Sequence, residues 1–207
     1  YHGGFLGGWI GTVLWCIRHK RPVWKWIDCM VVAIPAGYTF GRLGNFMNGE
    51  LYGRVTDMPW GVVFPSAEKF SGSIDWVKEF MEKIGMTAET AVVNLPRHPS
   101  QLYEAMFEGI FLFVVLWNLR KKKPFDGFLT CCYIFGYGLV RFVIEYFRAP
   151  DADLGFRLGD KSASIALNTS WTNISTGQIL CFGMMMISVI LGIVLYFRNK
   201  KKTDAKA

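Results

Sequence analysis

The sequence contains few acidic residues and few histidines, and its cysteines do not form a cluster. Of its 207 residues, 16 are Asp or Glu and 23 are Lys or Arg, so the formal net charge is +7. The three histidines and five cysteines form neither a Cys-x-x-Cys pair nor a cluster with the spacing of a zinc site. We therefore expect reduced, inert cysteines, no disulfide, no metal and no cofactor.

Apolar runs dominate the rest of the composition. Hydrophobic residues make up 52% of the chain, and the mean hydropathy is +0.25. Soluble domains seldom combine such values with long uncharged runs, so we expect a multi-pass membrane protein. Basic residues gather at the ends of the apolar runs, in residues 18–21, 120–123 and 198–202. That distribution is typical of topology signals and of contact with anionic lipid, and it argues against nucleic acid as a partner.

The apolar runs predict about five membrane segments. They cover residues 2–17, 27–40, 101–119, 128–147 and 179–197. When the chain alternates across the membrane, all three basic clusters fall on one side, which the positive-inside rule assigns to the cytoplasm together with the C-terminus. Pro35 predicts a kink in the second segment. The predicted fold is an all-α integral membrane protein, a polytopic helical bundle with a mixed extracytoplasmic excursion between helices.

The excursion covers residues 55–96, which are more polar than their surroundings. Residues 60–64 could form a short strand, and residues 73–84 an amphipathic helix with Ile74, Val77 and Met81 on one face. Gly85 would end that helix. We expect this insertion to lie against the outer membrane surface and to play no catalytic part.

A polar stretch, GRLGNFMNGELYGR, occupies residues 41–54, directly after an apolar segment. Ionisable groups at a membrane boundary persist only when they are paired or used. Arg42 and Arg54 carry planar guanidinium groups suited to phosphate, so one interpretation is a site for an anionic head group. The alternative is structural, with the glycines serving helix packing and Arg42 paired with Glu50.

A second charged pair lies in the segment 128–147. Arg141 and Glu145 are four residues apart and share one helix face, which in a membrane helix turns to the protein interior or to a wet cavity. They could form a structural salt bridge. Glu145 could equally hold Arg141 in place while Arg141 meets a phosphate, and the two interpretations are compatible.

The stretch at residues 41–54 resembles the signature of the bacterial prolipoprotein diacylglyceryl transferases. Further matching stretches occur in the order of the family, namely HGG at residues 2–4, RHPSQLYEA at 97–105 and GLVRFVIEYFRAPD at 138–151. The resemblance covers nearly the whole chain. In that family HGG lies well inside the protein, so we expect a C-terminal portion, with residues 1–207 forming a single membrane-embedded catalytic domain that lacks upstream helices.

The resemblance implies a transferase of the bacterial cytoplasmic (inner) membrane, with its active site on the extracytoplasmic side. Its partners would be phosphatidylglycerol, surrounding membrane lipid and the lipobox cysteine of a prolipoprotein, whose thiol is the nucleophile. The resemblance implies that the HGG histidine, His2, is essential. From the chemistry that this reaction demands, we expect His2 to be the general base and Arg42 and Arg141 to clamp the phosphate. The remaining head-group contacts would come from Asn45, Asn48, Glu50, Gly53 and Glu145. The oligomeric state stays open.

Two other classes of protein share some of these features. Transporters and channels also place charges and glycines inside the membrane, but the sequence has no internal repeat and its polar residues gather toward one face. A non-catalytic scaffold would not need so many arginines on the external side. Consumption of phosphatidylglycerol in the presence of a lipobox peptide would separate the transferase from both.

Overall fold

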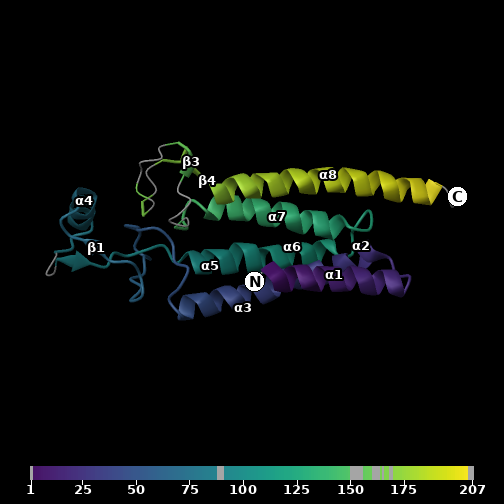
Figure 1. Cartoon of the computed structure of the whole chain (residues 1–207), viewed down its shortest axis with the longest axis horizontal. Helices are drawn as coiled ribbons and strands as arrows, with labels where there is room; N and C mark the ends of the chain where they lie inside the picture. The colour runs from purple at the N-terminus through teal and green to yellow at the C-terminus, as the bar shows by residue number, and fades with distance from the viewer. Residues whose placement is uncertain are drawn as a thin grey trace.

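A computed structural model of the chain describes residues 2–87, 91–149, 156–159, 164, 166–167 and 170–204. Helices lie side by side along most of an elongated molecule, and a smaller head with short strands and helix α4 (Asp75–Lys83) occupies the other end (Figure 1). The protein is mostly helical, as the apolar runs predict.

The helical part begins with α1 (His2–Arg18), α2 (Val23–Val31) and α3 (Ile34–Met47). After the head, α5 (Ser100–Glu104) continues through a π-helical segment, η1 (Ala105–Phe111), into α6 (Leu112–Leu119). Helix α7 (Phe128–Ile144) and the long helix α8 (Thr176–Asp204) then pack side by side (Figure 1).

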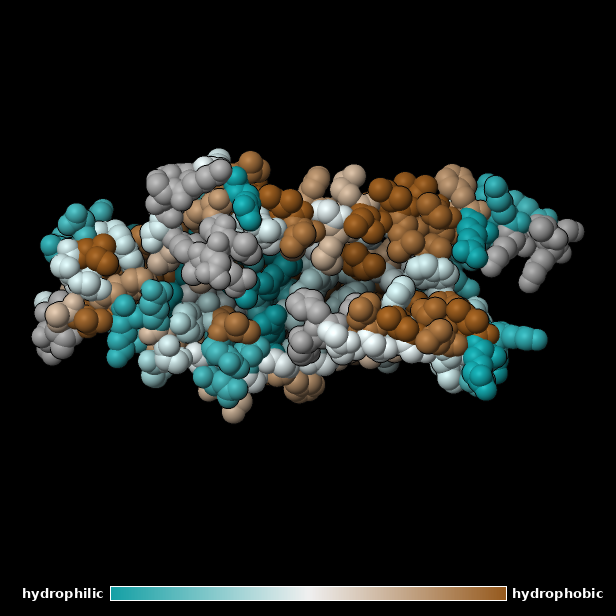
Figure 2. Space-filling model, in the orientation of Figure 1, coloured by the Kyte–Doolittle hydropathy of each residue, from teal (hydrophilic) through white to brown (hydrophobic). Residues whose placement is uncertain are grey.

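Two helical stretches, Ser100–Leu119 and Thr176–Lys201, are long and apolar enough to cross a membrane, and α7 is a shorter apolar helix. Along α8, large apolar side chains such as Leu180 and Ile187 are more than 60% exposed. Figure 2 shows this apolar surface over α8 and α1, with hydrophilic residues beyond it at the end that carries the C-terminus. An apolar outer surface of this kind fits lipid contact.

The ends of the predicted segments differ from the structure in three places. Pro35 lies in the first turn of α3, so it starts a new helix and does not kink a continuous one. Helix α3 continues to Met47, so half of the polar stretch at residues 41–54 is helical. Helix α7 ends at Ile144, which makes Glu145 its C-cap residue.

Asp28 joins α2 to the start of α7. Its fully buried carboxylate accepts hydrogen bonds from the backbone N–H groups of Gly127 and Thr130 at 2.9 and 3.0 Å, and from the Thr130 hydroxyl at 2.8 Å. Backbone N–H groups at a helix start lack partners within the helix, so the carboxylate satisfies them and sets where α7 begins.

The head has its own apolar core, formed by Val55, Val77, Phe80, Met81, Val93 and Leu95. Helix α4 and Gly85, whose φ is +68°, agree with the predicted amphipathic helix and its end, although Ile74 is the N-cap residue and is 39% exposed. The predicted strand at residues 60–64 is wrong, because only an isolated bridge from Val62 to Arg97 occurs there.

The named strands of the head lie elsewhere. Strands β1 (Phe70–Ser71) and β2 (Val92–Val93) pair antiparallel, with Phe70 opposite Val93. Strands β3 (Phe156–Leu158) and β4 (Ile174–Ser175) form a second antiparallel pair that leads into α8.

The backbone at residues 53–56 ties the head to the helices. The N–H of Gly53 donates to the carbonyl of His98, and the N–H of Arg54 donates to the carbonyl of Phe147, each at 2.9 Å. A Cβ at Gly53 would press on the Phe147 carbonyl and lie 2.8 Å from the His98 carbonyl oxygen. Three chain segments meet here only because residue 53 has no side chain.

Candidate functional site

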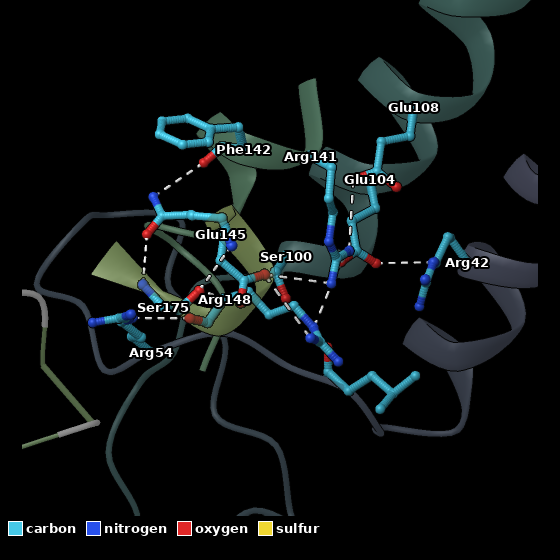
Figure 3. A network of polar contacts seen from close by, with 12 residues as sticks. Arg42, Arg54, Ser100, Glu104, Glu108, Arg141, Phe142, Glu145, Arg148 and Ser175 are labelled. Atoms are coloured by element: carbon cyan, nitrogen blue, oxygen red, sulfur yellow. Dashed lines mark hydrogen bonds and ion pairs between the residues drawn. The ribbon is translucent and has the colours of Figure 1, made fainter. Parts of the chain in front are cut away.

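A buried carboxylate, Glu104, is the centre of a charge cluster where the helices meet the head. The Arg42 Nε lies 2.9 Å from Glu104 Oε2, and the Arg141 Nη1 donates to Glu104 Oε1 at 2.5 Å. The Arg148 Nε lies 3.8 Å from the same Oε1. Figure 3 shows these arginines reaching Glu104 from different parts of the chain, with Arg42 on α3 and Arg141 on α7.

Two further glutamates complete the cluster. Arg141 lies 3.6 Å from Glu108 Oε1 and 3.5 Å from Glu145 Oε2, and Arg148 lies 4.0 Å from Glu145 Oε2. The predicted pairing of Arg141 with Glu145 is therefore present, although the nearest carboxylate to Arg141 is that of Glu104. Ser175 also donates a hydrogen bond to Glu145, at 3.0 Å.

The cluster has an acidic interior and a basic outer side. The side chains of Glu104 and Glu108 are 0% exposed and that of Glu145 is 5% exposed, whereas those of Arg42, Arg141 and Arg148 keep between 13% and 18%. With every group ionised the three arginines balance the three glutamates. An anion that approaches the cluster therefore meets guanidinium groups before carboxylates.

Glu104, Glu108 and Arg148 are not among the residues predicted for the head-group site, although Glu104 and Arg148 lie among the charged residues of the predicted external side. Glu104 and Glu108 are four residues apart inside an apolar run, the same pattern that singled out Arg141 and Glu145. Applied to residues 101–119, that criterion would have found both glutamates. Arg148 follows the end of α7, and its signal is that of an arginine on the predicted external side, where topology does not favour positive charge.

The alternative pairing of Arg42 with Glu50 is wrong, because Arg42 pairs with Glu104. Glu50 instead accepts hydrogen bonds at Oε1 from the side-chain amides of Asn45, at 3.0 Å, and Asn48, at 3.4 Å. The Gln101 amide donates to the Glu50 carbonyl at 2.7 Å. The three predicted pocket residues thus form one polar group at the end of α3, and it is connected to α5.

Glycine packing between helices does not explain the start of the polar stretch. A Cβ at Gly41 or Gly44 would meet no atom of the described residues within 4 Å. Gly53 is different, since its close contacts with His98 and Phe147 leave no room for a side chain. At Gly53, unlike at Gly41 and Gly44, the backbone packs directly against neighbouring backbone, which only glycine permits.

Arg54 does not act as an outward-facing phosphate ligand. It is 2% exposed, and its guanidinium donates to the carbonyls of Arg148 at 2.8 Å and Leu167 at 3.2 Å. Burial lowers the pKa of Arg54 to about 10, and Glu145 partly offsets this. The Arg54 guanidinium group therefore links three segments of the chain through hydrogen bonds to the Arg148 and Leu167 carbonyls.

The two histidines of the matched stretches differ in what the structure describes. Helix α1 starts at His2, but the His2 side chain lies outside the described part of the structure. His98 forms the turn before α5, because its carbonyl accepts from the Ser100 N–H at 2.8 Å. Burial lowers the pKa of His98, and Asp57 partly offsets this.

The positive charge at this site comes from arginine. Among the described residues, no group of three His, Cys, Asp or Glu side chains has an arrangement that could hold a metal ion. Arginine forks held against buried carboxylates supply fixed positive charge in surroundings of low dielectric constant. The arrangement can bind a phosphate and stabilise negative charge as it develops there.

The family model for prolipoprotein diacylglyceryl transferase matches residues 1–194. Among curated proteins, the chain is 52% identical over its whole length to a phosphatidylglycerol–prolipoprotein diacylglyceryl transferase of Treponema denticola and 50% identical over 99% of its length to one of Treponema pallidum. A protein of the same name from Chlorobaculum tepidum is 44% identical over 97% of the chain. The chain spans 63%, 63% and 56% of the length of these three relatives.

Proposed function

The chain belongs to the prolipoprotein diacylglyceryl transferase family, and on that premise we propose that it transfers the diacylglyceryl group of phosphatidylglycerol to the lipobox cysteine of a prolipoprotein. The product is a thioether on that cysteine, and glycerol phosphate is released. This is the first step of bacterial lipoprotein maturation. The observation that carries the proposal is the convergence of Arg42, Arg141 and Arg148 on the buried carboxylate of Glu104.

In the reaction, the substrate thiol loses its proton and its sulfur forms a bond to the terminal glyceryl carbon of the lipid. The bond from that carbon to the phosphate oxygen breaks, and the phosphate leaves with the electron pair. Negative charge therefore grows on the phosphate as the bond breaks. Arg42 and Arg141 are suited to stabilise it, because their guanidinium groups are already fixed and need no reorganisation.

We propose that His2 accepts the proton of the substrate thiol. An imidazole can accept a proton near neutral pH, which would raise the fraction of the reactive thiolate. The assignment rests on the HGG match at residues 2–4. His2→Asn should remove the base, so unchanged activity of that variant at every pH would show that the thiolate forms without His2.

The glycerol head group of the lipid would meet the polar group at the end of α3. Asn45, Asn48 and Glu50 already hydrogen-bond to one another, which supports a preformed recognition surface. Gly53 would shape this surface indirectly, because its close contacts with His98 and Phe147 hold the end of the polar stretch in place, and Glu145 would hold Arg141 for the head group.

We further propose a polytopic arrangement in the bacterial inner membrane, with the insertion at residues 55–96 and the arginine cluster on the extracytoplasmic side and the C-terminus in the cytoplasm. The basic residues at the ends of α1, α6 and α8 support this, because they lie at the end of the helical part opposite to the head (Figure 1).

The direct test places the protein in liposomes that contain phosphatidylglycerol and adds a lipobox peptide. Mass spectrometry should detect a diacylglyceryl adduct on the peptide cysteine, and Arg42→Ala should abolish it. Liposomes of phosphatidylcholine alone are the control for the lipid. Folded protein that yields no adduct with phosphatidylglycerol present would contradict the proposed reaction.

A further inference from the structure

Glu108, a member of the cluster, and Tyr38, which lies beside it, have no role in the reaction proposed above. Glu108 lies in η1 with 1% of its surface exposed, and the Tyr38 hydroxyl on α3 donates a short hydrogen bond to its Oε2. The other carboxylate oxygen, Oε1, accepts no hydrogen bond from a described group and lies 3.6 Å from Arg141. A buried carboxylate held on both sides in this way has a defined position.

Glu104 and Glu108 both reach Arg141 because they are four residues apart and share one face of the helix that runs from α5 into the π-helical segment. A π-helix closes its hydrogen bonds from residue i to i+5, so residues four apart lie closer to the same angular position than in an α-helix. The Arg141 Nη1 accordingly lies 2.5 Å from Glu104 and 3.6 Å from Glu108. Such segments are often found at functional sites.

Gly109 lets α3 approach this segment. A Cβ at Gly109 would press on the Thr39 hydroxyl and lie 3.0 Å from Thr39 Cβ. Thr39 is the neighbour of Tyr38 in the chain, so the close contact also fixes the height at which Tyr38 meets Glu108.

Tyr38 reaches the other arginine with its ring. The guanidinium carbon of Arg42 lies 4.7 Å from the Tyr38 ring centroid, within the range of a cation–π contact. Tyr38 therefore touches Arg42 with its ring and Glu108 with its hydroxyl, and Glu108 in turn contacts Arg141. The two side chains form a continuous connection between the arginines.

We propose that Tyr38 and Glu108 are positioning residues that brace Arg42 and Arg141 at the spacing needed to grip one phosphate. Two guanidinium groups repel each other, so their spacing has to be set by neighbours. A misplacement of about 1 Å in such a pair is enough to lower a rate roughly 100-fold. The inference rests on the proposed function, because it takes Arg42 and Arg141 as the phosphate clamp.

The test is a double-mutant cycle of Tyr38→Phe and Glu108→Ala. Tyr38→Phe keeps the ring below Arg42 and removes only the hydroxyl. Each change should lower kcat/KM for phosphatidylglycerol about 10- to 100-fold. The kcat/KM of the double variant should lie within about threefold of that of the less active single variant, because both changes remove the same connection. Glu108→Gln keeps an acceptor for Tyr38 and should recover most of the loss.

Ser188→Ala is the matched control. Ser188 is buried on α8 and donates to the Cys131 carbonyl at 2.7 Å, so the control also removes a buried hydrogen bond between helices. In the Ser188→Ala background, Tyr38→Phe should lower kcat/KM by the same factor as it does in the wild type. Unchanged activity of Tyr38→Phe, or an equal loss in the Glu108→Ala and Ser188→Ala backgrounds, would overturn the brace.

A second readout separates the brace from the reaction. We would measure how far phosphatidylglycerol raises the Tm of the detergent-solubilised protein above the value with phosphatidylcholine. Wild-type protein that shows this rise but transfers no lipid would overturn the proposed reaction. The double-mutant cycle would then be repeated with the rise in Tm as the measured quantity, to test whether Tyr38 and Glu108 position the two arginines. Wild-type protein that shows neither would overturn both.

Discussion

The Arg42 guanidinium lies 2.9 Å from the carboxylate of Glu104, a residue of another helix that is buried with 0% of its surface exposed. The contact brings together two of the stretches that resemble the transferase family, residues 41–54 and 97–105. Glu104 also contacts Arg141 and Arg148, so one carboxylate orients three guanidinium groups. Their outer faces stay accessible to an anion, which is the geometry that a phosphate clamp requires.

Arg42→Lys should lower transferase activity about 100-fold or more and leave the fold intact. Lysine keeps the positive charge but presents a single ammonium group, so it cannot contact Glu104 and a phosphate with one planar fork. Activity would be measured by adduct formation on a lipobox peptide, and folding by the Tm in detergent. Near wild-type turnover of this variant would remove Arg42 from the clamp.

Glu104→Gln should destabilise the protein as well as inactivate it. Without this carboxylate, three arginines share the charges of Glu108 and Glu145, and breaking a buried ion pair from one side costs about 3 to 5 kcal/mol. The free energy of unfolding in denaturant would show the loss. Glu50→Gln is a suitable comparison, since Glu50 contacts side-chain amides and should be far less costly for folding. Equal stability of wild type and Glu104→Gln would contradict this central role.

The sequence predicts contacts within one helix better than contacts between helices. The pairing of Arg141 with Glu145 follows from a spacing of four residues, and the structure has it at 3.5 Å. The pairing of Arg42 with Glu104 depends on how α3 packs against α5, and no local pattern encodes that. The nearer acidic residue, Glu50, is therefore a misleading candidate, because it lies beyond the end of α3 and contacts Asn45 and Asn48.

Helix ends were harder to predict than helices. The polar residues after Phe40 indicated the end of a membrane segment, yet α3 continues to Met47. Helix α3 can carry Arg42 among its apolar residues because a buried carboxylate from another helix meets it. The π-helical segment Ala105–Phe111 was likewise beyond prediction, since hydrophobic periodicity does not distinguish it from a regular helix.

Gly53→Ala should lower both stability and activity. The added methyl group would press on the Phe147 carbonyl and lie 2.8 Å from the His98 carbonyl, so backbone segments on both sides must move. Overpacking of this kind costs about 1 to 3 kcal/mol, and here it would also displace Arg148, the neighbour of Phe147. Thermal unfolding and the adduct assay would measure the two effects.

Gly41→Ala provides the contrast within the same stretch. No described atom lies within 4 Å of a Cβ there, and alanine favours the helix by about 0.5 to 1 kcal/mol over glycine. We expect Gly41→Ala to be neutral or slightly stabilising. If both alanine variants behaved alike, the difference in packing between Gly41 and Gly53 would not matter for the fold.

The hydrogen bonds around His98 predict a dependence of stability on pH. The Trp60 Nε1 donates to the Tyr103 hydroxyl oxygen at 2.6 Å, which leaves the hydroxyl hydrogen free to point at His98 Nδ1, 3.1 Å away. We therefore assign His98 Nδ1 as the acceptor of the Tyr103 hydroxyl, and in this assignment the imidazole is neutral and carries its proton on Nε2. Burial favours the same form and lowers the pKa of His98 below its usual 6.5.

The direction of this pH dependence follows from proton binding to His98 in the folded and unfolded states. His98 of the unfolded chain takes up a proton near pH 6.5, before that of the folded protein does. The contribution of His98 to the free energy of unfolding should therefore fall as the pH is lowered from about 7 toward 5, and the fall should stop once the folded His98 is also protonated. The half-buried side chain would lose its acceptor role toward Tyr103 on the way.

His98→Gln tests this assignment, because the glutamine carbonyl can still accept from Tyr103 but does not titrate. We expect Tm measured in detergent to decline less between pH 7 and 5 for His98→Gln than for wild type. Asp57, whose pKa is lowered mainly by a hydrogen bond from Lys83, contributes only nearer its ordinary value of 3.8, so it does not interfere in this window. Parallel declines of the two proteins would mean that the pKa of His98 is the same in the folded and unfolded states, which would contradict the assignment. A smaller decline in wild type would mean that folding favours the protonated imidazole, with His98 Nδ1 donating to the Tyr103 hydroxyl.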